Sequence, residues 1–148
     1  MYDISGRVLV KNNITKAVLR ERLIETLQSL GAEVRLSDED GAVEFKPAPR
    51  HRGKHPLKNI SFGRITLAMK DTTSLYIAEV NFQLSLTQMR LSLAVITLGL
   101  WGYSLLRGYD LVIPLAFTIL AWFFAYLLTL LTIQARFRLF IETTTLAS

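Results

Sequence analysis

The chain has 148 residues, of which 51% are hydrophobic, and its 17 Lys and Arg against 12 Asp and Glu give a formal net charge of +5. This length and this apolar content favour one small domain plus a membrane element over a single compact soluble domain. The chain contains no cysteine, which excludes a cysteine nucleophile and fits a reducing compartment.

The N-terminal part, residues 1–86, has the patterns of a small cytoplasmic α+β domain. A first strand is expected around Ile4 to Val10, and an amphipathic helix at residues 15–30, where apolar residues recur every three or four positions. Two hairpins follow, with turns at residues 37–41 and 71–74. We therefore expect about five strands, largely antiparallel after the first, with the helix packed on one face of the sheet.

A basic loop at residues 46–58 joins the two hairpins. It holds five cations, no acidic residue, both histidines and three of the four prolines of the chain. Because its five charges equal the net charge of the chain, an anionic partner is expected to contact the cations of this loop. They are Lys46, Arg50, Arg52, Lys54 and Lys58.

The alternatives for the basic loop are a plain solvated loop and contact with anionic lipid or an acidic protein surface. Nucleic acid is disfavoured, because the loop has no aromatic residue on which a base could stack. A metal site at His51 and His55 is also disfavoured, since no carboxylate or cysteine accompanies them and the prolines argue against a helix.

Two uncharged stretches, residues 91–106 and 111–133, predict a transmembrane helical hairpin over residues 87–135 with its turn at 107–110. About 20 residues at a rise of about 1.5 Å cross a hydrocarbon core of about 30 Å. The second stretch is long enough alone, whereas the first needs residues 86–89 and a snorkelling Arg90. The alternative of two buried helices requires more surrounding structure than a chain of this length offers.

Each predicted membrane helix carries a stripe of small residues that suits close helix packing. These intramembrane packing residues are Ser92, Gly99 and Gly102 on the first helix and Thr118, Ala121, Ala125 and Thr129 on the second. The two stripes are expected to pack against each other within the hairpin. The alternative is that one stripe receives a helix of another protein.

An aromatic cluster, Trp122, Phe123, Phe124 and Tyr126, is expected near the middle of the bilayer. Trp N–H and Tyr O–H groups at that depth need hydrogen-bond partners, which lipid tails do not offer. The cluster is therefore expected to form a protein–protein surface inside the membrane. Thr hydroxyls or backbone oxygens of the chain itself are the alternative partners.

Residues 136–148 are expected to form a short charged tail, in which a helix continuing from the membrane span is favoured over a strand. Arg90, Arg136 and Arg138 flank the ends of the hairpin nearest the domain, and the turn offers only Arg107 beside Asp110. The positive-inside rule then puts both termini in the cytoplasm, as in a protein of the bacterial inner membrane or its equivalent.

The sequence has no Gly-rich phosphate loop, HExxH or GxSxG motif, and it predicts no catalytic residue and no metal ligand. It leaves any cofactor unknown. The expected function is a non-catalytic accessory or scaffolding subunit of a membrane protein complex, whose partners are the lipid bilayer and other subunits or a second copy. The alternative is a membrane-anchored sensor or tether that binds anionic lipid through the basic loop.

Overall fold

The computed structural model describes residues 2–11, 15–38, 40–48, 55–72 and 75–146. Within these ranges the chain forms five strands and three helices, in the order β1 (Ile4–Lys11), α1 (Lys16–Ser29), β2 (Glu33–Leu36), β3 (Val43–Lys46), β4 (Phe62–Thr72), β5 (Leu75–Ser85), α2 (Thr87–Arg107) and α3 (Val112–Leu146).

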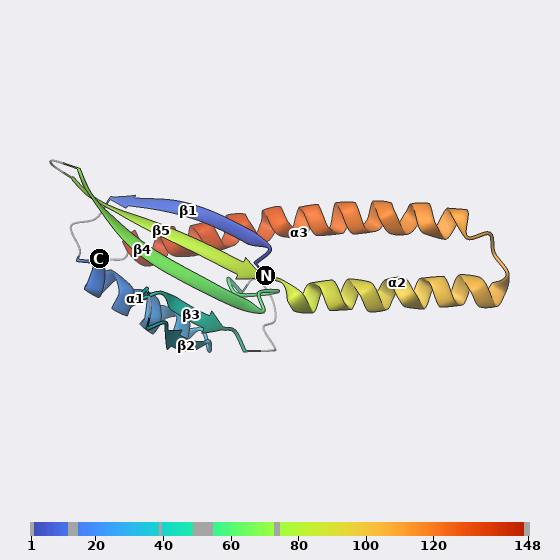
Figure 1. The fold of residues 1–148 in the computed structure, drawn as a ribbon, viewed down its shortest axis with the longest axis horizontal. Helices are drawn as coiled ribbons and strands as arrows, with labels where there is room; N and C mark the ends of the chain where they lie inside the picture. Colours follow the sequence, from blue (N-terminus) through green and yellow to red (C-terminus); the bar gives the residue numbers. More distant parts are fainter. Residues whose placement is uncertain (1, 12–14, 39, 49–54, 73–74, 147–148) are drawn as a thin grey trace.

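The five strands form one antiparallel sheet in the order β1-β5-β4-β3-β2 (Figure 1). The long strands β4 and β5 pair along their whole length, and β1 adds to the free side of β5. The short strands β2 and β3 complete the other side. The predicted class, an antiparallel-sheet α+β domain followed by a two-helix hairpin, is confirmed.

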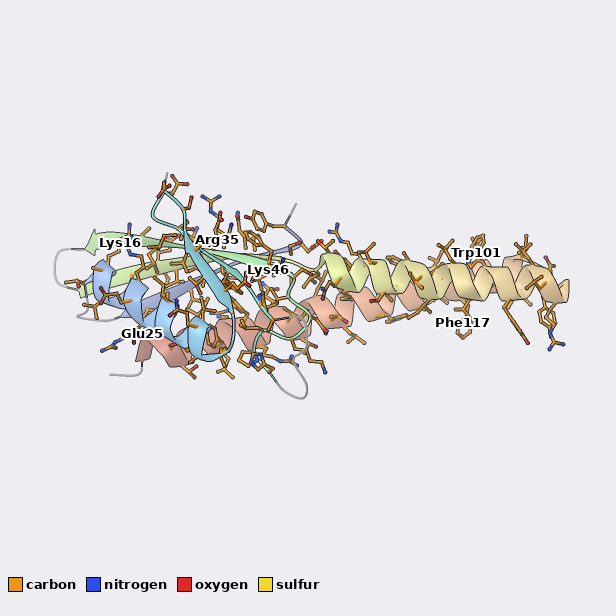
Figure 2. The ribbon with its side chains drawn as sticks, turned by 90° about the horizontal axis from the view of Figure 1, so that it is seen from below. Lys16, Glu25, Arg35, Lys46, Trp101 and Phe117 are labelled. Carbon is orange, nitrogen blue, oxygen red and sulfur yellow. The ribbon has the colours of Figure 1, made fainter. Side chains whose placement is uncertain are left out.

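One face of the sheet is covered by α1 and by the C-terminal half of α3, which contact each other (Figures 1 and 2). In α1 the fully buried residues are Leu19, Leu23 and Leu27. They are four residues apart, so they lie on one side of the helix and point into the core. Where its side chains are described, the opposite face of the sheet is largely polar apart from the exposed Leu9, and there Arg7 pairs with Glu79 at 3.0 Å.

An aromatic cluster ties α3 to the sheet. The ring of Phe137 lies 5.8 Å from the ring of Phe45 and 5.0 Å from that of Phe82, measured between centroids. Each of these two strand residues faces a glycine on the neighbouring strand, Gly63 for Phe45 and Gly6 for Phe82. A Cβ atom would lie 2.1 Å from the Phe45 ring at Gly63 and 2.2 Å from the Phe82 ring at Gly6. Only glycine leaves room for both rings.

The C-terminal half of α3 belongs to the domain core. The prediction of a helix continuing from the membrane span is confirmed, because α3 runs unbroken from Val112 to Leu146. The expectation of a short charged tail at 136–148 needs correction, since Phe137 and Ile141 are fully buried in the domain. The physical reason is that the 14 residues of α1 cover only part of a five-stranded sheet, and the remainder needs a second helix.

Helix α2 and the first half of α3 form an antiparallel hairpin that projects from the domain (Figure 1). At its tip Gly108 caps α2 in the left-handed conformation with φ 69°, which glycine adopts without strain. Both helices are long and apolar enough to cross a membrane, and 6% of the apolar 18-residue stretch of each is buried within the protein. These two apolar stretches therefore lie outside the core of the domain.

Candidate functional site: the hairpin and its junction with the domain

Two reciprocal hydrogen bonds join the helices of the hairpin. The indole Nε1 of Trp122 donates to Thr97 Oγ1 at 2.6 Å, and the indole Nε1 of Trp101, on the other helix, donates to Thr118 Oγ1 at 3.1 Å. Each helix thus contributes one Trp and one Thr, four residues apart, and each Trp reaches the Thr of the facing helix. We call these four residues the Trp–Thr clasp; Trp101 is labelled in Figure 2.

The polar groups of the clasp are satisfied within the hairpin. Thr97 Oγ1 also donates to the backbone oxygen of Leu93 at 2.8 Å, and Thr118 Oγ1 donates to that of Pro114 at 2.7 Å. Each hydroxyl therefore donates one hydrogen bond and accepts another, while each indole uses its single N–H. Such pairing suits a segment surrounded by lipid, where water is not available to replace a missing partner.

The expectation for the aromatic cluster changes at two of its four residues. Trp122 has Thr97 as its partner, and the hydroxyl of Tyr126 donates to Asp3 Oδ1 at 3.3 Å. Neither Trp122 nor Tyr126 therefore needs a hydrogen-bond partner from another protein. For Trp122 the partner is a Thr hydroxyl of the chain itself. Phe123 and Phe124 are 61% and 57% exposed, and their rings meet edge to face at 5.8 Å.

The depth expected for Trp122 also changes. Tyr126 lies at the base of the hairpin, where its hydroxyl donates to Asp3. Trp122 is four residues nearer the tip, about 6 Å along the helix at a rise of about 1.5 Å per residue. Trp122 therefore lies closer to the base of the hairpin than to its tip.

The junction between the hairpin and the domain is built around one buried carboxylate. The side chain of Asp3 is 1% exposed and forms an ion pair with Arg90 of α2. Its Oδ2 accepts a hydrogen bond from the backbone N–H of Leu86 at 2.7 Å, and its Oδ1 accepts one from Tyr126 of α3. A buried carboxylate is stable when a cation and several donors surround it. Asp3 thus links β1 to both helices at the base of the hairpin.

The small-residue stripe of α3 faces α2, whereas the glycines of the α2 stripe face away from α3. On α3, Thr118, Ala121 and Ala125 line a pocket of about 310 Å³ between the two helices, and Thr129 is half-buried. On α2, Ser92 and Gly99 are exposed, and Cβ atoms at Gly99 and Gly102 would have no neighbour within 4 Å. The expected packing of stripe on stripe is absent. On the α2 side this pocket is lined by Leu93, Ile96, Thr97, Leu100 and Ser104, so α2 does not turn its glycines toward α3.

The basic loop is described only at its two ends. Lys46 is exposed at the end of β3, and Lys58 is half-buried in a turn that precedes β4. Arg50, Arg52 and Lys54 lie outside the described residues. The turn at Lys58 lies against the first turns of α2, because Lys58, Gln88 and Ser92 line one pocket. The structure therefore brings one end of the loop to the base of the hairpin.

Among the described residues, no three or more His, Cys, Asp or Glu side chains gather in a way that could hold a metal ion. Asp3, at the base of the hairpin, forms an ion pair with Arg90, and Asp110, at its tip, accepts a hydrogen bond from the backbone N–H of Val112 at 3.5 Å. No cofactor contact is assigned to any residue.

No protein-family model matches the chain, and neither do the curated proteins or the solved structures with which it was compared.

The main features of the site were missed by sequence reasoning, although one of them had a signal. The segments TLGLW, ending at Trp101, and TILAW, ending at Trp122, share the spacing Thr-x-x-x-Trp. On two antiparallel helices this spacing places each Trp opposite the Thr of its partner. Asp3 had no such signal, because Leu86 and Tyr126 are 83 and 123 residues away along the chain.

Proposed function

We propose that this chain is an integral membrane protein that serves as a non-catalytic accessory or scaffolding subunit of a membrane protein complex. The observation that carries the proposal is the continuity of α3, whose 35 residues combine an exposed apolar half beside α2 with a half buried in the domain core. An apolar surface of this extent is stable in lipid and unstable in water. A helix continuous between the two environments fixes the domain at the membrane surface, which suits a scaffold.

The distribution of charge supports a cytoplasmic domain. Arg90 lies at the base of the hairpin, and Arg136 and Arg138 follow in the part of α3 that packs on the domain. The tip has Arg107 close to Asp110. Under the positive-inside rule the domain and both termini then lie in the cytoplasm, with the tip on the opposite side of the bilayer.

The exposed aromatic pair supports contact with other subunits. Phe123 and Phe124 present large apolar rings outside the hairpin interface. Aromatic side chains are enriched at protein interfaces, where they bury a large area at a small loss of conformational freedom. We take this pair as the side of the hairpin that meets a partner helix.

Membrane integration is tested by alkaline carbonate extraction of membranes that contain the full chain, combined with accessible tags at either terminus and at the tip. The chain should stay in the membrane pellet, with both termini labelled from the cytoplasmic side and the tip from the other. Release of the chain by carbonate would contradict an integral protein. Labelling of all three tags from one side would contradict a hairpin that crosses the bilayer.

The subunit role is tested by a photo-crosslinking amino acid placed at Phe124 and, as a matched control, at Val95, which is 68% exposed on α2. The proposal expects a discrete protein adduct from position 124, with the same partner recovered from position 123. Adducts to lipid alone at all three positions would contradict the subunit role but would remain consistent with membrane integration.

A second candidate function, a tether for anionic lipid, is favoured by the position of Lys58. This described end of the basic loop lies beside the first turns of α2, where a hairpin in a bilayer would leave the headgroup layer. Cations at that level are attracted by anionic headgroups at about 1 kcal/mol each. The two functions are compatible, since one uses the hairpin and the other uses the surface of the domain nearest the membrane.

A further inference from the structure

A polar pocket of about 260 Å³ lies where the domain meets the first turns of α2. The turn that ends the basic loop contributes Lys58 and Asn59, and α2 contributes Gln88 and Ser92. The neighbouring Leu57 is fully buried and anchors this turn in the core. The polar groups of the pocket are therefore held by the folded domain and by a helix.

The pocket has positive charge and unused donors. In the described part of the chain, the Lys58 ammonium makes no ion pair, and the side-chain amides of Asn59 and Gln88 make no hydrogen bond. Residues that line the pocket and are described include no carboxylate. Arg136 adds a second cation nearby, since its guanidinium and the Lys58 backbone N–H both donate to the backbone oxygen of His55, at 3.4 and 3.1 Å. An anion that accepts several hydrogen bonds would satisfy these groups.

The position of the pocket along the hairpin indicates where such an anion would come from. Ser92, on one wall, follows Leu91, the first residue of the uncharged run of α2. Lys58 and Asn59, on the opposite wall, belong to the domain. With the hairpin in a bilayer, the pocket opens at the level of the phosphates, between the hydrocarbon and the aqueous phase.

We propose that this pocket binds the phosphate-bearing headgroup of an anionic phospholipid. Lys58 supplies the opposing charge, and the amides of Asn59 and Gln88 donate hydrogen bonds to the phosphate oxygens. Ser92 is not a donor in this site, because its hydroxyl already donates to the backbone oxygen of Gln88 at 3.0 Å. The inference rests on the proposed placement of the hairpin in a membrane, and it assigns a ligand to one site at its base.

The test uses the full chain in mild detergent and measures lipid retention by native mass spectrometry, with phosphatidylglycerol and phosphatidylcholine added in equal amounts. The wild-type chain should retain phosphatidylglycerol preferentially. Lys58→Gln should lower this preference about fivefold, the effect of one cation near an anionic headgroup. The matched control is Lys16→Gln, because Lys16 is exposed at the far end of the domain from the hairpin (Figure 2) and should leave the preference unchanged.

Several outcomes would overturn the site. They are equal retention of the two lipids by the wild-type chain, unchanged preference in Lys58→Gln, and an equal loss in Lys16→Gln. A third arm adds inorganic phosphate; binding of free phosphate in place of the lipid would assign the pocket to a soluble anion. Gln88→Leu provides a second variant that removes a donor without removing charge, and it should also weaken retention.

Failure of this site and failure of the proposed function are distinguishable. A wild-type chain that stays in the membrane pellet after carbonate extraction but shows no preference for phosphatidylglycerol overturns the headgroup site alone. A chain that carbonate releases overturns the placement of the hairpin in the membrane, and the headgroup site with it.

Discussion

The two halves of α3 both carry large apolar side chains but face different surroundings. In the half beside α2, residues such as Phe117, Phe123 and Phe124 are exposed at 73%, 61% and 57%. In the half packed on the sheet, Phe137 and Ile141 are fully buried. The difference teaches that an apolar run in a sequence indicates removal from water without indicating whether lipid or protein takes the place of water.

The two halves of α3 also differ in the periodicity of their buried positions. Between Ile133 and Thr145 the buried positions recur at spacings of three and four residues, while Arg138 and Leu139 point outward. Near the tip apolar side chains lie all around the helix, as in a segment that has no aqueous face. One helix therefore changes from an all-round apolar pattern to an amphipathic one between Tyr126, whose hydroxyl contacts Asp3, and Ile133, its first buried residue.

The largest difference in stability is expected between two variants that each lose one aromatic ring, one in each half of α3. Phe137→Ala removes the ring between Phe45 and Phe82 and should lower the free energy of unfolding by about 3–5 kcal/mol. Phe124→Ala should change it by less than about 1 kcal/mol, because that ring is already exposed. Both are measured by thermal and chemical unfolding of the full chain in mild detergent. Equal destabilisation by the two variants would show that the exposed half is covered by protein.

A smaller loss of stability is expected when Asp3, which links the domain to the hairpin, is replaced. Asp3→Ala leaves Arg90 without its carboxylate and removes the acceptor of Tyr126 and of the Leu86 N–H. We expect a loss of about 2–3 kcal/mol, below the usual value for a broken buried pair, because Arg90 is 39% exposed and can reach water. Asp38→Ala, in the exposed turn after β2, is the matched control and should have little effect. A stable Asp3→Ala variant with unchanged unfolding would mean that the junction does not hold the hairpin.

Glycine substitutions give opposite signs in the domain and in the hairpin. Gly63→Ala would force a Cβ atom into the ring of Phe45 and should destabilise the domain by about 1–3 kcal/mol. Gly99→Ala meets no atom within 4 Å and should be neutral or stabilising by up to about 1 kcal/mol, through higher helix propensity. Unfolding in detergent measures both. Destabilisation by Gly99→Ala would indicate that another helix packs on this face of α2.

Most of the fold was predictable from the sequence because its signals are local. The strands alternate with period two, α1 repeats Leu every four residues, and Gly108 lies between two uncharged runs. Contacts between distant segments were not predictable in this way. The pairing of Phe45 with Gly63 depends on strand register, and the burial of Phe137 depends on how much of the sheet α1 leaves uncovered.

The features of the candidate site differ in the same way: those with a local sequence signal were predictable, and those formed by residues distant in sequence were not. The hairpin and its turn were expected from composition, and the Thr-x-x-x-Trp spacing was present in the sequence as a weaker local signal. The carboxylate of Asp3 meets its partners only after the sheet has brought β1 next to β5. No periodicity or motif near Asp3 predicts these contacts.

The smallest expected effect belongs to the clasp, and it tests whether the half of α3 beside α2 is held by specific contacts or by general packing. In a double-mutant cycle, Trp122→Phe and Thr97→Val each remove one end of a hydrogen bond between helices. We expect a coupling free energy of about 0.6 kcal/mol, and at most about 2, because such bonds in membrane helices have alternative partners in the unfolded state. Thr132→Val is the matched control, since its hydroxyl donates only to the backbone of its own helix, at 2.7 Å, and should show no coupling to Trp122→Phe. The cycle is measured by reversible unfolding in mixed micelles. Coupling as large with Thr132 as with Thr97 would assign the effect to the lost volume of the indole, and the hairpin would then be held by packing alone.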